Sequence, residues 1–155
     1  MSLVISYLVD HPECLPQLAG WAFEAWGRYN PSSSLERAQD KLKTHLNKSR
    51  LPLTYIVFKE DLLAGMCSLR MNDGIRPDLA PWLGSLYVEP DMRGQGIGEE
   101  LIRVTTEKAR SMGYHKLYLL AFDKTLPDWY QKLGWQMLGV DELNGHPVSV
   151  MEMTL

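Results

Sequence analysis

Hydrophobic and polar residues follow two different periods at the beginning of the chain. Residues 3–9 are apolar and β-rich, which predicts a first strand. The apolar residues that follow recur every three or four positions up to Trp26, the spacing of a helix with one buried face. We place the start of this helix at Asp10, because Glu13 follows three positions later as in a capping box, and its end near Gly27.

The next pattern predicts a second helix and then a hairpin. Ser33 and Glu36 form another capping box, and the apolar face of the helix that they open extends to Leu46. Two apolar runs, 53–58 and 62–69, are separated by a short charged connection. Such a connection suits an antiparallel pair of strands.

The second half of the chain predicts a parallel unit. Glycine and prolines make residues 72–81 a loop, and a strand follows over 82–88. A glycine-studded segment then precedes a helix that ends at Gly113, and residues 117–122 form a continuous apolar strand. A strand, a helix and a strand within about 40 residues have the size of a right-handed βαβ unit with parallel strands.

A short helix and a final hairpin close the chain. The helix runs from Thr125 to Gly134, and strands over 135–140 and 148–154 surround an Asn-Gly turn. The predicted order is therefore β-α-α-β-β-β-α-β-α-β-β. This order indicates an α/β or α+β fold, a mixed sheet with helices on its faces, in one domain spanning residues 1–155.

Composition and charge narrow the classes of protein. The 155 residues are 45% hydrophobic, which suits one core. There are 16 Lys plus Arg and 19 Asp plus Glu, so the net charge of −3 argues against nucleic acid or an anionic membrane as the main partner. No signal-peptide pattern opens the chain, and its longest apolar run has six residues, so we expect a cytoplasmic protein. Cys14 and Cys67 lie far apart without a CxxC motif or a histidine pair, so we expect no metal site and no disulfide framework.

The segment between the fourth strand and the third helix carries the clearest chemistry. Gly94, Gly96 and Gly98 alternate there, so successive main-chain N–H groups can converge on one anion. The N-terminus of the following helix adds free donors, and Arg93 adds a full positive charge. A pyrophosphate would fit this turn, whereas the dinucleotide and P-loop motifs match less well because Glu99 replaces the third glycine and no Gly-Lys-Ser/Thr ending is present. A plain tight turn with a surface arginine is the alternative.

This segment resembles the signature of the GNAT superfamily of N-acetyltransferases. The bacterial form of that signature, V-x-P-x-x-R-G-x-G-I-G, is matched at every fixed position from Val88 to Gly98. The segment from Asp123 to Trp135 resembles a second family motif, N-x-x-A-x-x-F-Y-x-x-x-G-F, with Asp123 and Leu126 in place of Asn and Ala. The resemblance implies a GNAT-like fold, with a mostly antiparallel sheet and one parallel pair formed by the fourth and fifth strands.

The resemblance also implies acetyl-coenzyme A as the co-substrate. In the family the fourth and fifth strands splay apart, main-chain groups of the turn bind the pyrophosphate, and the edge of the fourth strand pairs with the pantetheine. The cofactor-binding residues implied here are Leu86, Tyr87, Val88, Arg93, Gly94, Gln95, Gly96, Ile97, Gly98, Asp123, Leu126 and Tyr130.

Tyr130 stands where many family members carry the general acid. A tyrosine with a pKa of about 10 is protonated at neutral pH, and giving its proton to a thiolate of pKa about 8.5 costs about 2 kcal/mol. The alternative is an aromatic residue that only packs in the apolar face of the fourth helix. The base is left open among a water chain and four carboxylates, namely Glu24, Asp73, Asp78 and Glu89. None of the four histidines is given a role.

We therefore expect an N-acetyltransferase that moves an acetyl group directly to a primary amine of a small molecule, peptide or protein in a ternary complex. Coenzyme A binding without turnover, as in a sensor or interaction module, is the alternative, and a longer acyl group or a hydroxyl acceptor is a further one. Trp21, Trp26, Tyr29 and the segment 71–81 are expected to shape the acceptor cleft, where acidic residues would suit a cationic amine. By analogy with the family, we expect a homodimer formed through the C-terminal strands.

Overall fold

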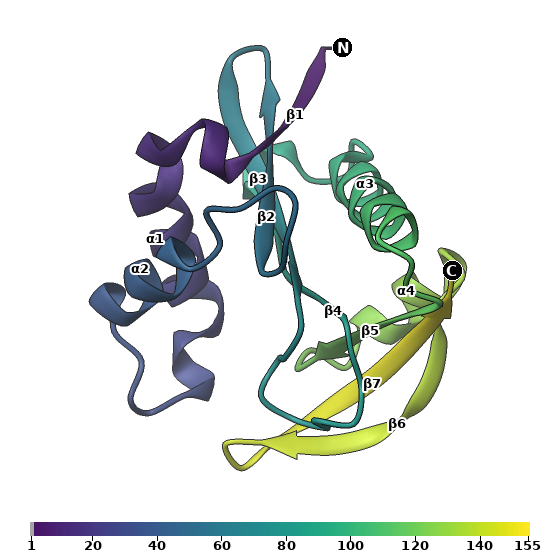
Figure 1. The fold of residues 1–155 in the computed structure, drawn as a ribbon. Coiled ribbons are helices and arrows are strands. Elements are labelled where there is room, and N and C mark those ends of the chain that lie inside the picture. Colours follow the sequence, from purple (N-terminus) through teal and green to yellow (C-terminus); the bar gives the residue numbers. More distant parts are fainter. Residues whose placement is uncertain (1) are drawn as a thin grey trace.

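A seven-stranded sheet in the order β1-β2-β3-β4-β5-β7-β6 organises the computed structural model, which describes residues 2–155 (Figure 1). Every neighbouring pair is antiparallel except β4 and β5. The strands are β1 (Leu3–Tyr7), β2 (Leu53–Lys59), β3 (Leu62–Arg70), β4 (Trp82–Val88), β5 (Lys116–Ala121), β6 (Gln136–Leu143) and β7 (His146–Thr154). The α-helices are α1 (Leu15–Trp26), α2 (Leu35–Lys43), α3 (Ile97–Ser111) and α4 (Leu126–Lys132). The predicted order of elements and the mixed fold class are confirmed.

The helices form a layer on each side of the sheet (Figure 1). Side chains of β2 alternate between the two layers, as the period of a strand requires. Tyr55 and Val57 pack in one cluster with Leu101 of α3, and Ile56 packs in another with Leu18 of α1. The fully apolar strands that the sequence shows are therefore buried on both faces. None of the helices within residues 2–155 combines the length and the apolar character needed to cross a membrane.

The start of α1 differs from the prediction. The first strand ends at Tyr7 rather than at residue 9, and two 3-10 turns follow it, so that α1 begins only at Leu15. The capping box of Asp10 and Glu13 is wrong, because no side chain caps this helix. The physical reason is burial: the fully buried Leu8 packs with α1, which forces the chain to turn before the helix can begin.

The start of α2 lies one residue later than predicted. Ser34 is the N-cap, and its hydroxyl accepts a hydrogen bond from the Arg37 N–H at 3.0 Å. Ser33 instead donates its hydroxyl to the Gly27 carbonyl at 2.8 Å, which ties α2 to the 3-10 turn η3 (Gly27–Tyr29) after α1. The helix ends at Lys43, before Leu46.

Candidate active site

The two parallel strands separate soon after they meet. The register of β4 and β5 contains one pair within residues 2–155, Trp82 with Tyr118, and the Tyr118 N–H donates to the Pro81 carbonyl at 3.1 Å. Beyond this point β4 continues to Val88 with no residue of β5 in register. The splayed strands expected from the family resemblance are present.

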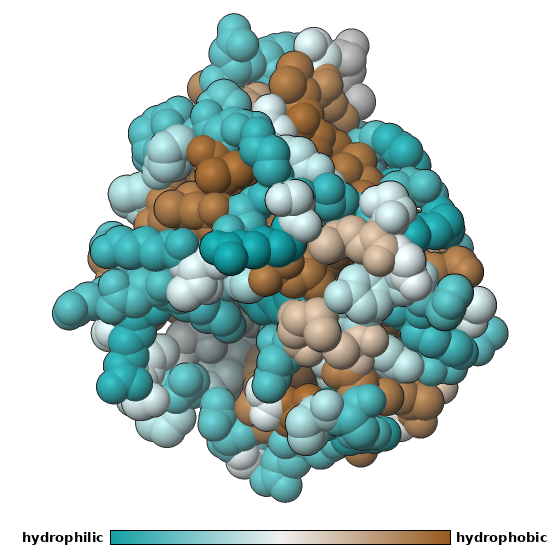
Figure 2. Space-filling view, in the orientation of Figure 1, coloured by the Kyte–Doolittle hydropathy of each residue, from teal (hydrophilic) through white to brown (hydrophobic). Residues whose placement is uncertain are grey.

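A cavity of about 840 Å³ lies at this separation. It is lined by the end of α1, by η3 and α2, by β4 and the glycine turn, and by the end of β5 with α4. Figure 2 shows the surface hollowed below α2, on a face that is otherwise mostly hydrophilic with separate hydrophobic patches. Eleven of the twelve predicted cofactor residues line it. The exception is Gln95, whose side chain accepts a hydrogen bond from Lys59.

The glycine turn has the backbone shape that its sequence predicts. Gly94 and Gly96 have φ angles of +77° and +84°, which other residues adopt only with strain. Gly96 is also the N-cap of α3, and no side chain caps that helix, so its first N–H groups have no capping partner. The Arg93 Nε donates to the Val88 carbonyl at 2.8 Å, and its guanidinium lies 5.4 Å from the centre of the Tyr87 ring. The arginine is thereby held against the end of β4.

Tyr130 both packs in the core and lines the cavity, so the two sequence interpretations of this residue are not exclusive. It is 6% exposed, and its ring lies against Trp129 and Trp135 with centroids 5.0 and 6.0 Å apart. Burial, with a smaller contribution from Cys67, raises the pKa of the Tyr130 phenol. The hydroxyl is therefore protonated at neutral pH.

Asp123 stabilises the turn before α4. Its carboxylate accepts hydrogen bonds from the Thr125 N–H at 2.8 Å and from the Thr125 hydroxyl at 2.7 Å, and these bonds lower the pKa of Asp123. The Thr125 side chain, predicted as a helix cap, makes no cap hydrogen bond. Asp123 thus occupies the cavity wall with its carboxylate already engaged.

The four carboxylates considered as bases lie apart. Only Asp73 lines the cavity, and it forms an ion pair with Arg70 at 3.1 Å. Glu24 and Glu89 line a second, smaller depression, and Asp78 pairs with Arg76 at 3.0 Å.

Of the aromatic residues expected to shape the cleft, two reach it. Trp26 and Tyr29 line the cavity. Trp21 is 6% exposed and stacks on Tyr87 at 4.9 Å instead. In the segment 71–81 the lining residue is Asp73.

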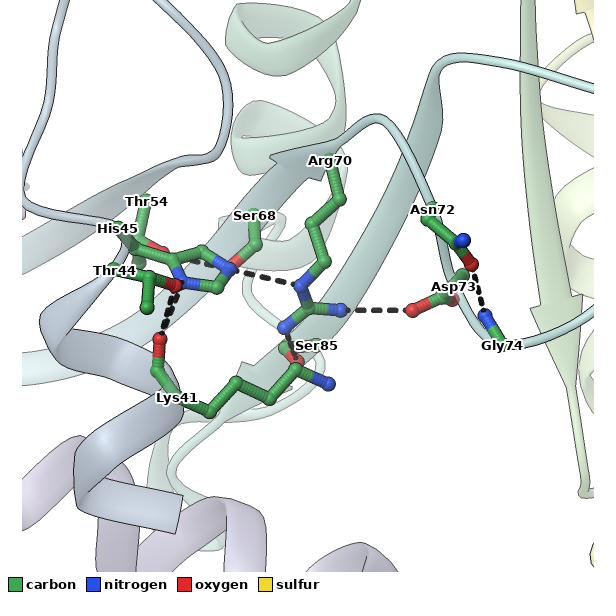
Figure 3. A network of polar contacts seen from close by, with 10 residues as sticks. All are labelled: Lys41, Thr44, His45, Thr54, Ser68, Arg70, Asn72, Asp73, Gly74 and Ser85. Atoms are coloured by element: carbon green, nitrogen blue, oxygen red, sulfur yellow. Dashed lines mark hydrogen bonds and ion pairs between the residues drawn. The ribbon is translucent and has the colours of Figure 1, made fainter. Parts of the chain in front are cut away.

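A polar network beneath α2 was missed by the sequence interpretation (Figure 3). His45, which was given no role, is 1% exposed, and its Nε2 accepts a hydrogen bond from the Arg70 Nε at 2.9 Å. Its Nδ1 lies 2.8 Å from the Lys41 carbonyl and must be the donor there. Burial and the charge of Arg70 lower the pKa of His45 to about 3, so the ring is neutral.

The network ends on the bulge of β4. Arg70 donates to Asp73 and to the Ser85 hydroxyl, and Ser85 has a φ of +50° where the pairing of β3 and β4 shifts register. A Cβ at Gly84 would overlap the guanidinium. The sequence feature that could have indicated this network is Arg70, a charged residue at the end of the mostly apolar strand β3.

The chain matches the family model described as "Acetyltransferase (GNAT) family" over residues 10–135. It belongs to this family.

GNAT relatives of known function align over part of the chain only. Bovine (Bos taurus) thialysine N-epsilon-acetyltransferase is 41% identical over 59 residues, which are 37% of this chain and 35% of the relative. Glucosamine 6-phosphate N-acetyltransferase of Trypanosoma brucei brucei is 41% identical over 51 residues, 33% of this chain and 34% of the relative. The aligned parts thus span about a third of each curated relative.

Solved GNAT structures share the whole fold. Aminoglycoside 6'-acetyltransferase type Ii superposes with a TM-score of 0.72 at 24% identity, over 97% of this chain and 96% of that one. An aminoglycoside 6'-N-acetyltransferase in complex with coenzyme A gives 0.73 at 20% identity, with the same coverage. N-acetylglutamate synthase from Neisseria gonorrhoeae, in complex with coenzyme A and N-acetyl-glutamate, gives 0.75 at 20% identity, over all of this chain and 35% of that one.

The residues of this GNAT chain fit coenzyme A at three places. Left-handed glycines and an uncapped helix N-terminus provide donors for a diphosphate. The last residues of β4 have no register partner in β5, so the main-chain groups on that edge, apart from the Val88 carbonyl that accepts from Arg93, are open to pairing with an extended arm. The cavity reaches both features and continues to Tyr130. In residues 2–155 no group of three or more His, Cys, Asp or Glu is placed to hold a metal ion.

Proposed function

We propose that this protein is an acetyl-coenzyme A-dependent N-acetyltransferase that acts on a primary amine by direct transfer in a ternary complex. The observation that carries the proposal is the single cavity that joins the glycine turn, the unpaired edge of β4 and Tyr130. The names of the two curated relatives refer to N-acetyltransfer, with thialysine and glucosamine 6-phosphate as the molecules named. An amine is therefore the acceptor that we favour.

The main chain and Arg93 bind the co-substrate in this proposal. Acetyl-coenzyme A supplies an acetyl group activated as a thioester. The N–H groups of residues 93–98 bind the diphosphate, and Arg93 adds a positive charge beside it. The main chain of Leu86 to Val88 pairs with the extended arm, and the Val88 N–H polarises the acyl carbonyl.

Tyr130 completes the transfer by supplying a proton. The amine nitrogen forms a bond to the acyl carbon, the carbon–sulfur bond breaks, and the sulfur takes the proton of the Tyr130 hydroxyl. A proton of the amine leaves to water or to a carboxylate, and the tyrosine is then reprotonated from solvent. The water chain and the carboxylate remain two alternatives for this step.

The raised pKa of Tyr130 is compatible with proton donation, because a thiolate is destabilised by the same surroundings. Burial raises the pKa of the nearby Cys67 thiol to about 12. A coenzyme A thiolate that loses water beside Tyr130 would have its proton affinity raised in the same direction as that of the phenol.

Two measurements made on the same preparation test the proposal. Free-thiol release from acetyl-coenzyme A is followed with polyamines, amino acids, aminoglycosides, amino sugars and peptides with free N-termini, and coenzyme A binding is measured by calorimetry. Binding together with release by one class of amine is the expected result. Binding without release by any amine would favour the sensor, and absence of binding would contradict both functions.

A further inference from the structure

Positive side chains gather on the α1–α2 side of the cavity, although the chain as a whole has a net charge of −3. Arg28 of η3, Arg37 and Lys41 of α2, and Arg70 of β3 all line it there. Two of the acidic residues that line the cavity act on them: Asp73 is paired with Arg70, and Asp123 is close enough to Arg28 for that charge to contribute to its lowered pKa. Arg37 and Lys41 are members of this group with no ion-pair partner among residues 2–155.

Arg70 is the fixed member of this group. Its side chain is 7% exposed, and its three nitrogens donate to His45, Asp73 and Ser85. His45 is neutral, so it orients the guanidinium without changing its charge. Arg70 thus forms a rigid positive base under α2 that Asp73 neutralises in part.

Lys41 is the member that remains available for a ligand. Figure 3 shows its side chain extended toward the guanidinium of Arg70 and Ser85. Its ammonium has no hydrogen-bond or ion-pair partner among residues 2–155, and the same holds for the side chain of Arg37 one turn earlier. The charge of Arg70, more than burial, lowers the pKa of Lys41 to about 8, and the charge of Asp73 opposes part of this effect. A bound anion would offset the repulsion that is left.

These cations are separate from the expected diphosphate site. The glycine turn leads into α3 on one side of the sheet, whereas α2 lies on the other (Figure 1). Arg93 already supplies the turn with a positive charge. The cavity-lining residues of α2 are therefore on the side of the sheet opposite α3, away from the turn that the co-substrate diphosphate would occupy.

We propose that the amine acceptor carries an anionic group, a carboxylate or a phosphate, that Lys41 and Arg37 bind over the base formed by Arg70. This inference rests on the proposed function and narrows its acceptor class. It disfavours a polycationic acceptor, although solved aminoglycoside acetyltransferases share the fold. It also differs from the expectation from sequence of a cationic amine: Glu24, Glu89 and Asp78 lie outside the cavity, and Asp73, which lines it, is paired with Arg70.

Matched acceptors test the inference. Thiol release is measured with an α-amino acid and its carboxamide, and with an amino-sugar phosphate and the unphosphorylated amino sugar. We expect the anionic member of at least one pair to have the higher kcat/KM. The pair that shows the difference identifies carboxylate or phosphate as the bound group.

Substitutions on α2 test the residues. Lys41→Gln should raise the KM of the anionic acceptor about tenfold, the loss typical of one charged hydrogen bond, and Lys41→Arg should restore most of it. The matched control is Lys43→Gln, because Lys43 lies on the same helix, pairs with Asp40 at 3.6 Å and does not line the cavity. The affinity for coenzyme A should stay the same in all three variants.

The failures are distinguishable. If no amine releases thiol, the proposed function itself fails. If amines react but neither pair shows a preference for its anionic member, the function stands and the anionic acceptor is overturned. If Lys41→Gln weakens coenzyme A binding instead of raising the KM of the acceptor, these cations serve the co-substrate and the inference is also overturned.

Discussion

His45 is a histidine that the fold holds neutral. Its ring is enclosed by β3 and the end of α2, and the neighbouring Arg70 makes a second positive charge unfavourable. Its Nε2 has to stay unprotonated in order to accept the hydrogen bond from Arg70. The unfolded chain has no such constraint, so its histidine titrates near pH 6.5.

This difference predicts an acid-sensitive stability. Above about pH 6.5 His45 is neutral in both the folded and the unfolded protein. Below about pH 6.5 the histidine of the unfolded protein becomes protonated, whereas in the folded protein it stays neutral down to about pH 3. The free energy of unfolding should therefore fall as the pH decreases through this window, by up to about 1.4 kcal/mol per pH unit from this residue. Urea unfolding of the native protein and of His45→Gln between pH 4 and 7 measures it.

Comparison of the two proteins removes the contribution of the carboxylates, because the same carboxylates titrate in the native protein and in His45→Gln. We expect His45→Gln to be less stable at pH 7, since it loses part of the Arg70 contact, and to decline less steeply toward pH 4. Parallel pH dependences for the two proteins would show that His45 does not carry the effect.

Tyr130 allows the chemical role of a hydroxyl to be separated from the packing of its ring. Tyr130→Phe keeps the contacts with Trp129 and Trp135 and removes only the proton donor. We expect kcat to fall at least about a hundredfold, the usual contribution of a general acid, with little change in coenzyme A affinity or melting temperature. Steady-state kinetics and calorimetry measure the two quantities.

Tyr118→Phe is the matched control for this change. Tyr118 is also largely buried, at 9% exposure, but does not line the cavity. Its kcat should equal that of the native protein. An unchanged kcat for Tyr130→Phe would reduce Tyr130 to a packing residue.

Single side chains differ in how far the sequence alone could place them. Tyr130 and the turn glycines belong to short motifs, so their spacing already predicts their place in the fold. Arg70 and His45 lie 25 positions apart, and only the packing of α2 on the sheet brings them together. No local pattern encodes such a contact.

Among the elements, those with a local cause could be predicted best. The Asn144-Gly145 turn has φ angles of +52° and +81°, the left-handed pair that an Asn-Gly turn favours. The start of α1 could not be placed, because it depends on the burial of Leu8 against residues distant in sequence. The capping motif there competes with tertiary packing, and packing decides the outcome.

The glycine turn gives a prediction at this scale. Gly98 does not need a left-handed backbone, and a Cβ there would meet Trp129 at 3.4 Å, an ordinary contact. Gly98→Ala should therefore fold normally, but its methyl group would hinder the close approach of a diphosphate to the main chain. We expect coenzyme A to bind about tenfold more weakly, as for the loss of one charged hydrogen bond.

Gly20→Ala is the control for Gly98→Ala. Gly20 lies within α1, and a Cβ there has no atom within 4 Å. This variant should bind coenzyme A normally and gain about 0.5–1 kcal/mol of stability from the better helix propensity of alanine. Calorimetry and thermal unfolding compare the two. Equal affinities for Gly98→Ala and Gly20→Ala would contradict close approach at the turn.

At the scale of the whole molecule, one interruption of the sheet creates the site. Antiparallel pairs hold β1 to β4 together, and β5 to β7 form a second antiparallel group. The two groups meet through the pair of Trp82 with Tyr118. The size of the βαβ unit predicted that β4 and β5 are parallel. The separation of the two strands was expected from the family resemblance alone, and its extent depends on the tertiary structure.

The free edge of β6 is the feature of the whole molecule that favours a homodimer. β6 is the last strand of the sheet, and Met137, Leu138 and Val140 are exposed on it, Val140 by 74%. An exposed apolar edge strand tends to pair with another chain. We expect two copies to associate through β6, and Val140→Glu to oppose this by placing two like charges near the interface. Sedimentation equilibrium should give about twice 17.7 kDa for the native protein and the monomer mass for the variant.

The control for this surface is Val4→Glu. Val4 is also exposed, by 54%, but lies on β1 at the opposite edge of the sheet. This variant should keep the dimer mass if β6 forms the interface. A native protein that sediments as a monomer at every concentration would rule out the dimer, and dissociation by Val4→Glu alone would move the interface to β1.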